Sequence, residues 1–344
     1  MPRRSEVTID LGALARNVAR LREAAAPAEV WAVVKADAYG HGALDCARTA
    51  LNAGAAALCV ATAQEGAALR AELPDARILV MGPLADGEDE VARGARLEAA
   101  VSRADRIPDG LDLHLKVDTG MGRFGMTPDE AVAVPRERVV GVMSHLATAD
   151  EEDGAFVRGQ LDVFADLAAQ FPGVTTHVAN SAAALRFPEA RFDAVRCGVA
   201  LYGLSPFHGD PADHGLEPVL SWRSFIAQAR TLQPGESTGY GRRFVAERET
   251  RVGLVPVGYA DGFRRGLTGA EVVVNGTRRR VVGTVSMDSF AVELGDEEAG
   301  APVTLIGDGV LAEEHAHHLG TINYDLTAGI RTAPERADRR VVRG

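Results

Sequence analysis

Short apolar runs alternate with segments of helical period over residues 30–200 of the chain. Each run is followed by an alanine-rich segment, such as 63–73 or 156–170, whose apolar residues recur at spacings of three and four. Strands that are apolar on both faces and alternate with helices are typical of a parallel sheet covered by helices. The eight runs are Val30–Val34, Leu58–Ala61, Ile78–Met81, Leu97–Val101, Leu111–Val117, Val139–His145, Thr175–Ala179 and Val195–Ala200.

Eight strand–helix units over this length predict a (β/α)8 barrel, and an open, doubly wound sheet is the alternative. In such a barrel the functional side chains stand at the carboxyl ends of the strands and in the loops that follow. The ends of the eight runs are therefore where candidate chemistry is expected.

The pattern changes after about residue 216 to valine-rich alternation with frequent turn residues. Residues 271–274 and 278–282 flank Asn275-Gly276, a pair that supplies the positive backbone angles of a tight hairpin turn. We predict a barrel over residues 11–215 and a mainly β domain made of residues 1–10 and 216–344. Ser5–Asp10 has the pattern of a strand and is expected to join the β domain, with Asp10 as the N-cap of the first helix.

Composition and charge narrow the class of protein. A length of 344 residues fits roughly two domains, and 46% hydrophobic and 25% charged residues are typical of a folded globular protein. A net charge of −11 disfavours nucleic acid and anionic membranes as partners and favours a small-molecule substrate. The sequence has neither a run of ~18–20 apolar residues nor a signal-type start, which predicts a cytoplasmic protein. Three scattered cysteines, Cys46, Cys59 and Cys197, indicate neither disulfides nor a metal site.

Reactive side chains stand at several predicted strand ends. Partial burial of Lys35 would lower its pKa from about 10.4 and provide an amine for a Schiff base, whereas a lysine extending to solvent is the alternative. His145 is a candidate catalyst, with a hydrogen-bonded structural histidine as the alternative. Ser181 and Gly198 follow the seventh and eighth strands, where barrels bind phosphate through hydroxyls and backbone amides. The combination fits either a lysine-dependent aldolase or a pyridoxal phosphate enzyme.

Two other motifs are weaker. Residues 120–125 (GMGRFG) match the letters of the dinucleotide-binding fingerprint, but they follow the fifth predicted strand, and no strand-ending acidic residue lies about 20 residues later. His315, His317 and His318 are too crowded to face one metal from a helix, so a solvated helix surface is predicted. Neither nucleotide nor metal binding is expected from these motifs.

Seven motifs in consistent order are similar to those of the alanine racemases, a family of pyridoxal phosphate enzymes with a (β/α)8 barrel and a C-terminal β domain. The resemblance covers most of the chain. The motifs are Val34–Gly42 (VKADAYGHG), Lys116–Arg123 (KVDTGMGR), Ser144–Asp150 (SHLATAD), His177–Ser181 (HVANS), Arg196–Gly203, Gly258–Gly262 (GYADG) and Thr284–Asp288. Residues 328–336 depart from the family, which more often has an Arg-Val-Pro-Arg run there, although Asn323-Tyr324 is intact.

The resemblance implies that Lys35 holds pyridoxal 5'-phosphate as an internal aldimine. It also implies that His145 packs on the pyridine ring and that Arg196 faces the ring nitrogen. Because a guanidinium keeps its proton, that nitrogen would stay an unprotonated acceptor and the ring would be a weaker electron sink. The other cofactor-binding residues implied by the resemblance are Tyr39, Asn180, Ser181, Gly198, Val199 and Tyr324.

The resemblance further implies a two-base transfer of the α-proton on the pyridoxal phosphate aldimine. Lys35 would take the proton of the D isomer and Tyr259 that of the L isomer, with Tyr259 supplied by the partner subunit of a homodimer. Met287 would join Tyr259 there, and Arg123 would bind the substrate carboxylate or the phenolic oxygen of the cofactor. Lys116 matches a position that can be carbamylated, which would turn a cation into an anion that orients Arg123.

These observations predict an enzyme that interconverts L-alanine and D-alanine and supplies D-alanine for peptidoglycan. A broader-specificity amino-acid racemase of the same fold is one alternative, because a hydrophobic pocket discriminates one methylene by only ~1–3 kcal/mol. A non-catalytic pyridoxal phosphate carrier is the other. The β domain argues against the carrier, because a carrier needs no second base.

Overall fold

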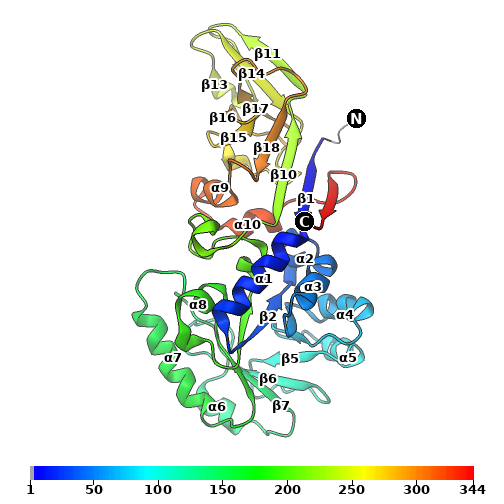
Figure 1. The fold of residues 1–344 in the computed structure, drawn as a ribbon, viewed down its shortest axis with the longest axis vertical. Helices are drawn as coiled ribbons and strands as arrows, with labels where there is room; N and C mark the ends of the chain where they lie inside the picture. The colour runs from blue at the N-terminus through cyan, green and yellow to red at the C-terminus, as the bar shows by residue number, and fades with distance from the viewer. Residues whose placement is uncertain (1–3) are drawn as a thin grey trace. The chain divides into compact units, whose positions relative to one another are not determined.

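The structure, a computed structural model, describes residues 4–344 and divides them into two compact units (Figure 1). One unit, which we call the barrel unit, comprises residues 14–207 and 215–217. The other, the β unit, comprises residues up to 13, residues 208–214 and residues 218–344.

Within residues 14–207, eight parallel strands form one sheet in the order β8-β7-β6-β5-β4-β3-β2-β9. The strands thus follow chain order, and the last lies beside the first. Backbone bonds from Asp193 N to Thr176 O (3.1 Å) and from Arg196 N to Ala179 O (2.9 Å) join the segments of β8 and β9. The predicted barrel is confirmed, and the doubly wound alternative is wrong. The strands are β2 Glu29–Val33, β3 Ala57–Val60, β4 Ile78–Val80, β5 Glu98–Val101, β6 Asp112–Lys116, β7 Val139–Met143, β8 Thr175–His177 and β9 Ala194–Cys197.

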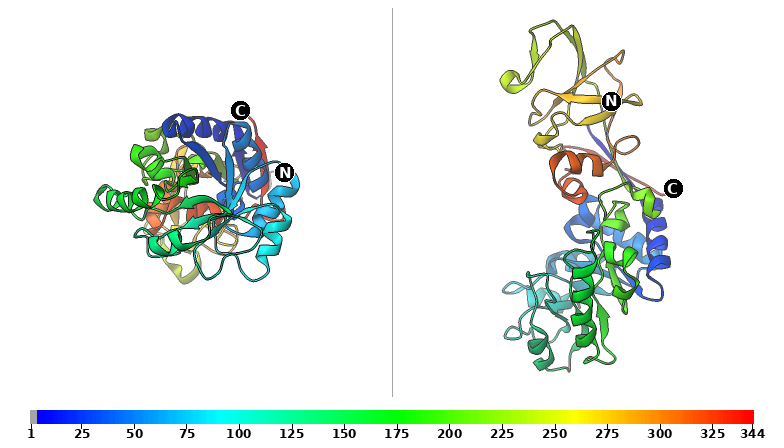
Figure 2. Two further views of the ribbon diagram at one scale, coloured as in Figure 1. Left: turned by 90° about the horizontal axis from the view of Figure 1, so that it is seen from below. Right: turned by 90° about the vertical axis from the view of Figure 1, so that its left-hand side faces the viewer.

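Helices surround these strands on the outside, as the left view of Figure 2 shows. In α7 the buried apolar residues Val157, Leu161, Phe164 and Leu167 recur at spacings of four and three, so one stripe packs inward. A capping box between Thr62 and Glu65 starts α4. The helices are α1 Leu11–Ala25, α2 Lys35–Gly40, α3 Ala43–Asn52, α4 Ala63–Glu72, α5 Glu88–Gly94, α6 Pro128–Ala133, α7 Ala155–Ala168 and α8 Ser181–Arg186.

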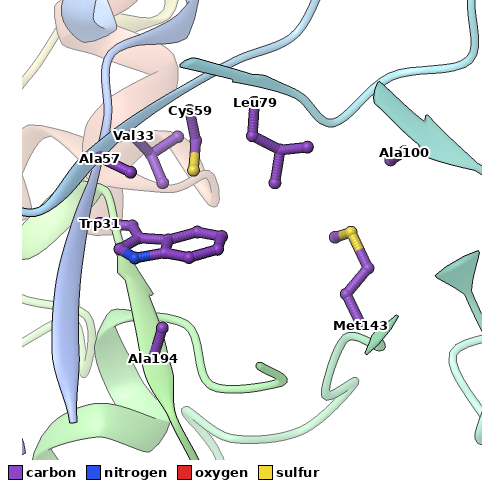
Figure 3. Close-up of a cluster of buried hydrophobic side chains, with 8 residues drawn as sticks. All are labelled: Trp31, Val33, Ala57, Cys59, Leu79, Ala100, Met143 and Ala194. Atoms are coloured by element: carbon purple, nitrogen blue, oxygen red, sulfur yellow. The ribbon is translucent and has the colours of Figure 1, made fainter. Parts of the chain in front are cut away.

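The barrel interior is filled by residues that alternate along the strands with outward-facing ones. One part of it is apolar, with the indole of Trp31 lying among smaller side chains (Figure 3). The apolar cluster is Trp31, Val33, Ala57, Cys59, Leu79, Ala100, Met143 and Ala194. The other part is polar and buried, and contains His114, Lys116, His177 and Arg196.

The β unit is built on a nine-stranded sheet in the order β11-β14-β17-β16-β15-β18-β10-β1-β19. β1 pairs with β10 and β19, which confirms that the N-terminal strand joins this unit. Asn275 (φ 45°) and Gly276 (φ 82°) form the predicted hairpin turn between β15 and β16. The strands are β1 Glu6–Asp10, β10 Leu220–Phe225, β11 Gln228–Leu232, β14 Thr250–Val255, β15 Glu271–Val274, β16 Thr277–Val282, β17 Phe290–Glu293, β18 Pro302–Ile306 and β19 Asp338–Val342, with the separate pair β12 Ser237–Thr238 and β13 Phe244–Val245.

Two helices, α9 (Ala312–Leu319) and α10 (Asn323–Ala328), also belong to the β unit. His317 and His318 are exposed on α9 as predicted. The prediction for His315 is wrong, because its ring is buried and Nε2 lies 2.7 Å from Leu305 O. Over the residues that the structure describes, no group of side chains could hold a metal ion, and no helix is long and apolar enough to cross a membrane.

Candidate active site

The chain turns in an unusual way directly after β2. Ala36, Asp37, Ala38 and Tyr39 all have φ between 51° and 56°, so four consecutive residues form a left-handed helical turn. This conformation costs ~1–2 kcal/mol per L-residue, and runs of it persist only where neighbouring groups hold them. Glu65 accepts the Ala36 N–H at 2.7 Å, and Asp37 accepts the Ala43 N–H at 2.7 Å. The turn fixes the directions in which Lys35 and Tyr39 leave the barrel rim.

Lys35 is half-buried at the start of this turn. Burial lowers the pKa of its amine, and the positive charge of Arg123 lowers it further, while Glu65 opposes the shift. A lowered pKa increases the share of neutral amine, which is the form that attacks carbonyls and takes up protons. The structure therefore favours a reactive amine over a lysine that extends to solvent.

Donors converge where β8 and β9 end. The Ser181 hydroxyl oxygen accepts the N–H groups of Gly198 (2.9 Å) and Ala200 (3.4 Å). A Cβ at Gly198 would lie 2.4 Å from the Tyr39 hydroxyl, so only glycine leaves room there. Asn180 caps α8 by accepting the Ala183 N–H at 3.0 Å. The Ser181 hydroxyl thus gathers two backbone N–H groups, and its own O–H, together with the Tyr39 hydroxyl beside Gly198, forms a polar cup suited to an anion such as phosphate.

Arg196 lies fully inside the barrel and is held by backbone oxygens. Its Nη1 donates to His177 O (2.8 Å), and its Nη2 donates to Ser144 O (2.6 Å) and Val178 O (3.2 Å). Burial lowers the pKa of this guanidinium to about 10, which leaves it charged at neutral pH.

The ring of His145 lies beside this guanidinium, with Nδ1 3.4 Å from Arg196 Nη2. Burial and the charge of Arg196 lower the pKa of His145 to about 3, so the ring is neutral. Since Nδ1 faces a donor, the proton belongs on Nε2. His145 can therefore offer one N–H at the end of β7.

The loop after β6 carries Lys116 and Arg123. In the segment that matches the dinucleotide fingerprint, Gly120 and Gly122 donate their N–H groups to the Asp118 carboxylate at 2.9 Å each. Burial, together with the charges of Arg196 and Arg123, lowers the pKa of Lys116 to about 8. Lys116 is thus buried at a strand end rather than solvent-facing.

Three predicted site residues belong to the β unit. Tyr259 and Met287 are exposed there, at 42% and 51%. Their loops are joined by backbone bonds from Tyr259 N to Ser286 O and from Ala260 N to Met287 O, both 3.0 Å. Tyr324 lies in α10. Tyr259 and Met287 are therefore presented together at the surface of their own unit.

Within the barrel unit, the structure brings most of the predicted residues to one end of the barrel. The charges of Lys35, Lys116, Arg123 and Arg196 all act on the pKa of His145. The pattern analysis missed Glu65, Glu98, His114 and Gln160. Gln160 joins two loops, since it accepts the Ala147 N–H (2.9 Å) and donates to His145 O (3.1 Å) after β7, and also donates to Thr119 Oγ1 (3.3 Å) after β6. For His114 a signal exists: it lies two residues before Lys116 and therefore shares its inward face of β6.

Lysine is rare in this chain, and both lysines belong to the site. Lys35 and Lys116 are the two lysines among 37 Lys and Arg residues. Both lie at strand ends in the barrel unit.

The barrel places a lysine with a lowered pKa at one strand end and an anion-binding cup, formed by Ser181, Gly198 and Tyr39, at the ends of neighbouring strands. This arrangement is typical of enzymes that bind a phosphorylated aldehyde cofactor through a lysine. The donor set fits pyridoxal phosphate, since the cup suits its phosphate and the Lys35 amine suits its aldehyde.

Comparison with known proteins gives the particular family. The family models described as "Alanine racemase, N-terminal domain" and "Alanine racemase, C-terminal domain" match residues 9–206 and 219–338. The alanine racemase of Streptomyces coelicolor is 40% identical over 95% of this chain and 94% of its own length. The chain therefore belongs to the alanine racemase family.

Solved structures agree with this family. The alanine racemase of a D-cycloserine-producing Streptomyces lavendulae superimposes with a TM-score of 0.92 at 39% identity, covering 100% of this chain and 98% of that one. The Bartonella henselae alanine racemase with covalently bound pyridoxal phosphate gives 0.91 at 28% identity, covering 98% and 99%. The predicted fold class, alanine racemase activity and pyridoxal phosphate cofactor are confirmed.

Proposed function

We propose that this protein interconverts L-alanine and D-alanine with pyridoxal phosphate held on Lys35. One observation carries the proposal: the half-buried amine of Lys35, whose pKa is lowered, lies at the same end of the barrel as the cup formed by Ser181 and Gly198. Residues 11–215 hold the cofactor, and residues 1–10 and 216–344 supply a second base.

The cofactor is held by groups at three strand ends. The Lys35 amine would bind its aldehyde carbon, and Ser181, Gly198 and Tyr39 would hold its phosphate. Asn180 and Val199 shape this cup, and Tyr324 adds its hydroxyl. When bound, pyridoxal phosphate supplies an aldehyde that condenses with amines and a ring that withdraws electrons from Cα of the amino acid.

Arg196 limits how strongly that ring withdraws electrons. Its guanidinium stays protonated and can only donate a hydrogen bond to the ring nitrogen, so it cannot supply the proton that would charge the ring. His145, neutral and half-buried beside it, would pack on the ring without adding charge. With Arg196 and His145 in these roles, the ring would be a weak electron sink, which would favour prompt return of a proton to Cα over transamination.

Proton transfer uses one group on each face of the substrate. Lys35 Nζ, as a neutral amine, would take the α-proton of D-alanine while the Tyr259 hydroxyl donates a proton to the opposite face. In the reverse direction the Tyr259 phenolate would take the α-proton of L-alanine while the Lys35 ammonium donates. Arg123 binds the substrate carboxylate or the phenolic oxygen of the cofactor, and Met287 lies next to Tyr259. Carbamylation of Lys116 gives Arg123 an anionic partner. The exposure of Tyr259 and Met287 supports their insertion into the barrel of a partner subunit in a homodimer.

The physiological setting follows from the reaction and from the sequence. D-Alanine is a building block of peptidoglycan, and we place the enzyme in the cytoplasm, where that material is made. Its partners are a small amino acid and a second copy of the chain.

The reaction is tested by incubating the purified protein and pyridoxal phosphate with L-alanine in heavy water. D-Alanine carrying deuterium at Cα is expected, measured by NMR and chiral chromatography. Tyr259→Phe should keep the cofactor absorbance and lose most racemisation. Cofactor binding without exchange would instead identify a carrier, and equal rates over a panel of amino acids would identify a broad-specificity racemase.

A further inference from the structure

A chain of hydrogen bonds crosses the polar half of the barrel interior. Arg196 Nη1 lies 2.7 Å from His177 Nδ1, and His177 Nε2 lies 2.8 Å from His114 Nδ1. His114 Nε2 lies 2.8 Å from Glu98 Oε2, and Arg77 Nε donates to Glu98 Oε1 at 2.7 Å. Four strands, β9, β8, β6 and β5, each contribute one residue from Arg196 to Glu98.

The direction of every proton in this chain is fixed by its two ends. A guanidinium only donates, so His177 Nδ1 must accept and the proton of a neutral His177 must be on Nε2. That proton is donated to His114 Nδ1, which leaves the His114 proton on Nε2. The His114 Nε2–H then donates to the Glu98 carboxylate, which, when ionised, can only accept. Every hydrogen bond from Arg196 to Glu98 thus has one donor and one acceptor.

The electrostatics agree with neutral rings between a cation and an anion. Burial lowers the pKa of His177 well below its ordinary value, and the Arg196 charge lowers it further. Burial also lowers the pKa of His114, although the hydrogen bond to Glu98 opposes this. Burial alone would raise the pKa of Glu98, but hydrogen bonds from His114 and Arg77 hold it below its ordinary value.

Packing holds the two imidazoles in place. The Trp31 ring centroid lies 4.6 Å from that of His177 and 5.7 Å from that of His114. On β7, a Cβ at Gly141 would lie 1.9 Å from His114 Nδ1, so the glycine lets the ring lie against the strand. The rings cannot turn over without displacing these neighbours.

We propose that Glu98, His114 and His177 form a one-directional relay that positions Arg196, with both imidazoles neutral and protonated on Nε2. The relay and the backbone oxygens engage both terminal nitrogens of Arg196, and among residues 4–344 none accepts from its Nε. Nε–H is thus the donor available to the ring nitrogen. The inference rests on the proposed role of Arg196, and it makes these three residues positioning residues.

The tautomers can be read directly by long-range 15N–1H correlation NMR of histidine-labelled protein near neutral pH, with and without pyridoxal phosphate. His177 and His114 are assigned from the signals lost in His177→Gln and His114→Gln. The chain carries its own standards, because His315 Nε2 faces a carbonyl, whereas His41 Nδ1 lies 3.0 Å from Ala38 O. The relay requires His114 and His177 to match His315. An Nδ1–H tautomer or an imidazolium at either position overturns it.

A pair of variants tests the positioning role. His177→Gln can still accept from Arg196 and donate to His114, whereas His177→Phe can do neither. We expect His177→Phe to lower kcat about 10- to 100-fold with little change in KM and to shift the cofactor absorbance, and His177→Gln to restore most of both. Equal kcat values in the two variants contradict the role. Since the tautomers are measured without turnover, failure of the relay is distinguishable from failure of the racemase assignment.

Discussion

The protonation of single side chains at the barrel end depends on the charges around them. Lys35, Lys116, Arg123 and Arg196 are four cationic groups within electrostatic reach of one another, and burial reduces the water that would screen them. Repulsion among these positive charges is relieved when the lysines lose their protons, because the guanidinium groups keep theirs. The site therefore holds two amines that lose their protons readily and two guanidinium groups that stay positively charged.

Gly198→Ala tests the anion-binding cup. The added methyl group must displace the Tyr39 hydroxyl, so we expect the affinity for pyridoxal phosphate to fall about 10- to 100-fold, measured by absorbance titration. Gly159→Ala is the matched control, because a Cβ there meets nothing within 4 Å and α7 gains a better helix former. Unchanged affinity in Gly198→Ala would place the phosphate elsewhere.

Carbamylation of Lys116 should depend on pH. Carbon dioxide reacts with the neutral amine, and a pKa of about 8 means that the neutral share rises as pH increases toward that value. At fixed dissolved 13CO2 we expect the 13C carbamate signal to increase between pH 6.5 and 8, at the expense of the protonated amine. Lys116→Gln should remove the signal, and its absence from the parent protein at every pH would rule out the modification.

At the scale of elements, the left-handed turn after β2 is the feature that local preference works against. Its four residues include two alanines, whose intrinsic preference is right-handed helix. The turn exists because α4 presents Glu65, whose carboxylate accepts the Ala36 N–H (2.7 Å) and the Ala61 N–H (2.8 Å). A helix cap thus shapes the segment that carries the reactive lysine.

Glu65→Gln should weaken this arrangement, because an amide has one oxygen where the carboxylate uses two. We expect the free energy of unfolding in urea to fall by ~1–3 kcal/mol and the retention of cofactor after dialysis to decrease. Glu72→Gln is a control on the same helix with an exposed side chain, expected to change stability by less than ~0.5 kcal/mol. Equal effects in the two variants would contradict the role of Glu65.

Element-scale features differ in how far sequence predicts them. The eight strands and the Asn275-Gly276 hairpin follow from apolar period and turn chemistry, which are local. The left-handed turn follows from Glu65, some 30 residues away, and is invisible in Lys35–Gly40 alone. The Arg196–Glu98 relay needs four strands in register. Its members could be flagged as inward polar residues, but their partners could not be assigned.

At the scale of the whole molecule, the proposed active site requires two chains. Lys35 and the cup belong to the barrel unit, and the exposed Tyr259 and Met287 belong to the β unit. A net charge of −11 coexists with a cationic site, so the acidic surface and the anion-binding function are spatially separate properties of one chain.

Mixing two inactive variants tests whether sites are shared. When Lys35→Ala and Tyr259→Phe subunits exchange, a hybrid dimer with shared sites has one site with both mutations and one with neither. Random exchange makes half of the dimers hybrid, so about a quarter of the parental racemase activity should return. Mass spectrometry of the mixture verifies exchange. Verified hybrids with no more activity than the separate variants would mean that each site is built by one chain.

Because the chain has two lysines, few of its groups can react with the aldehyde of the cofactor. Pyridoxal phosphate is an aldehyde and condenses with amines, whereas guanidinium groups remain protonated and do not compete. Apart from the chain terminus, the amines available are Lys35 and Lys116, both at the barrel end. Apart from that terminus, no surface amine competes with Lys35 for the cofactor, and lysine-directed labelling reports on the barrel end.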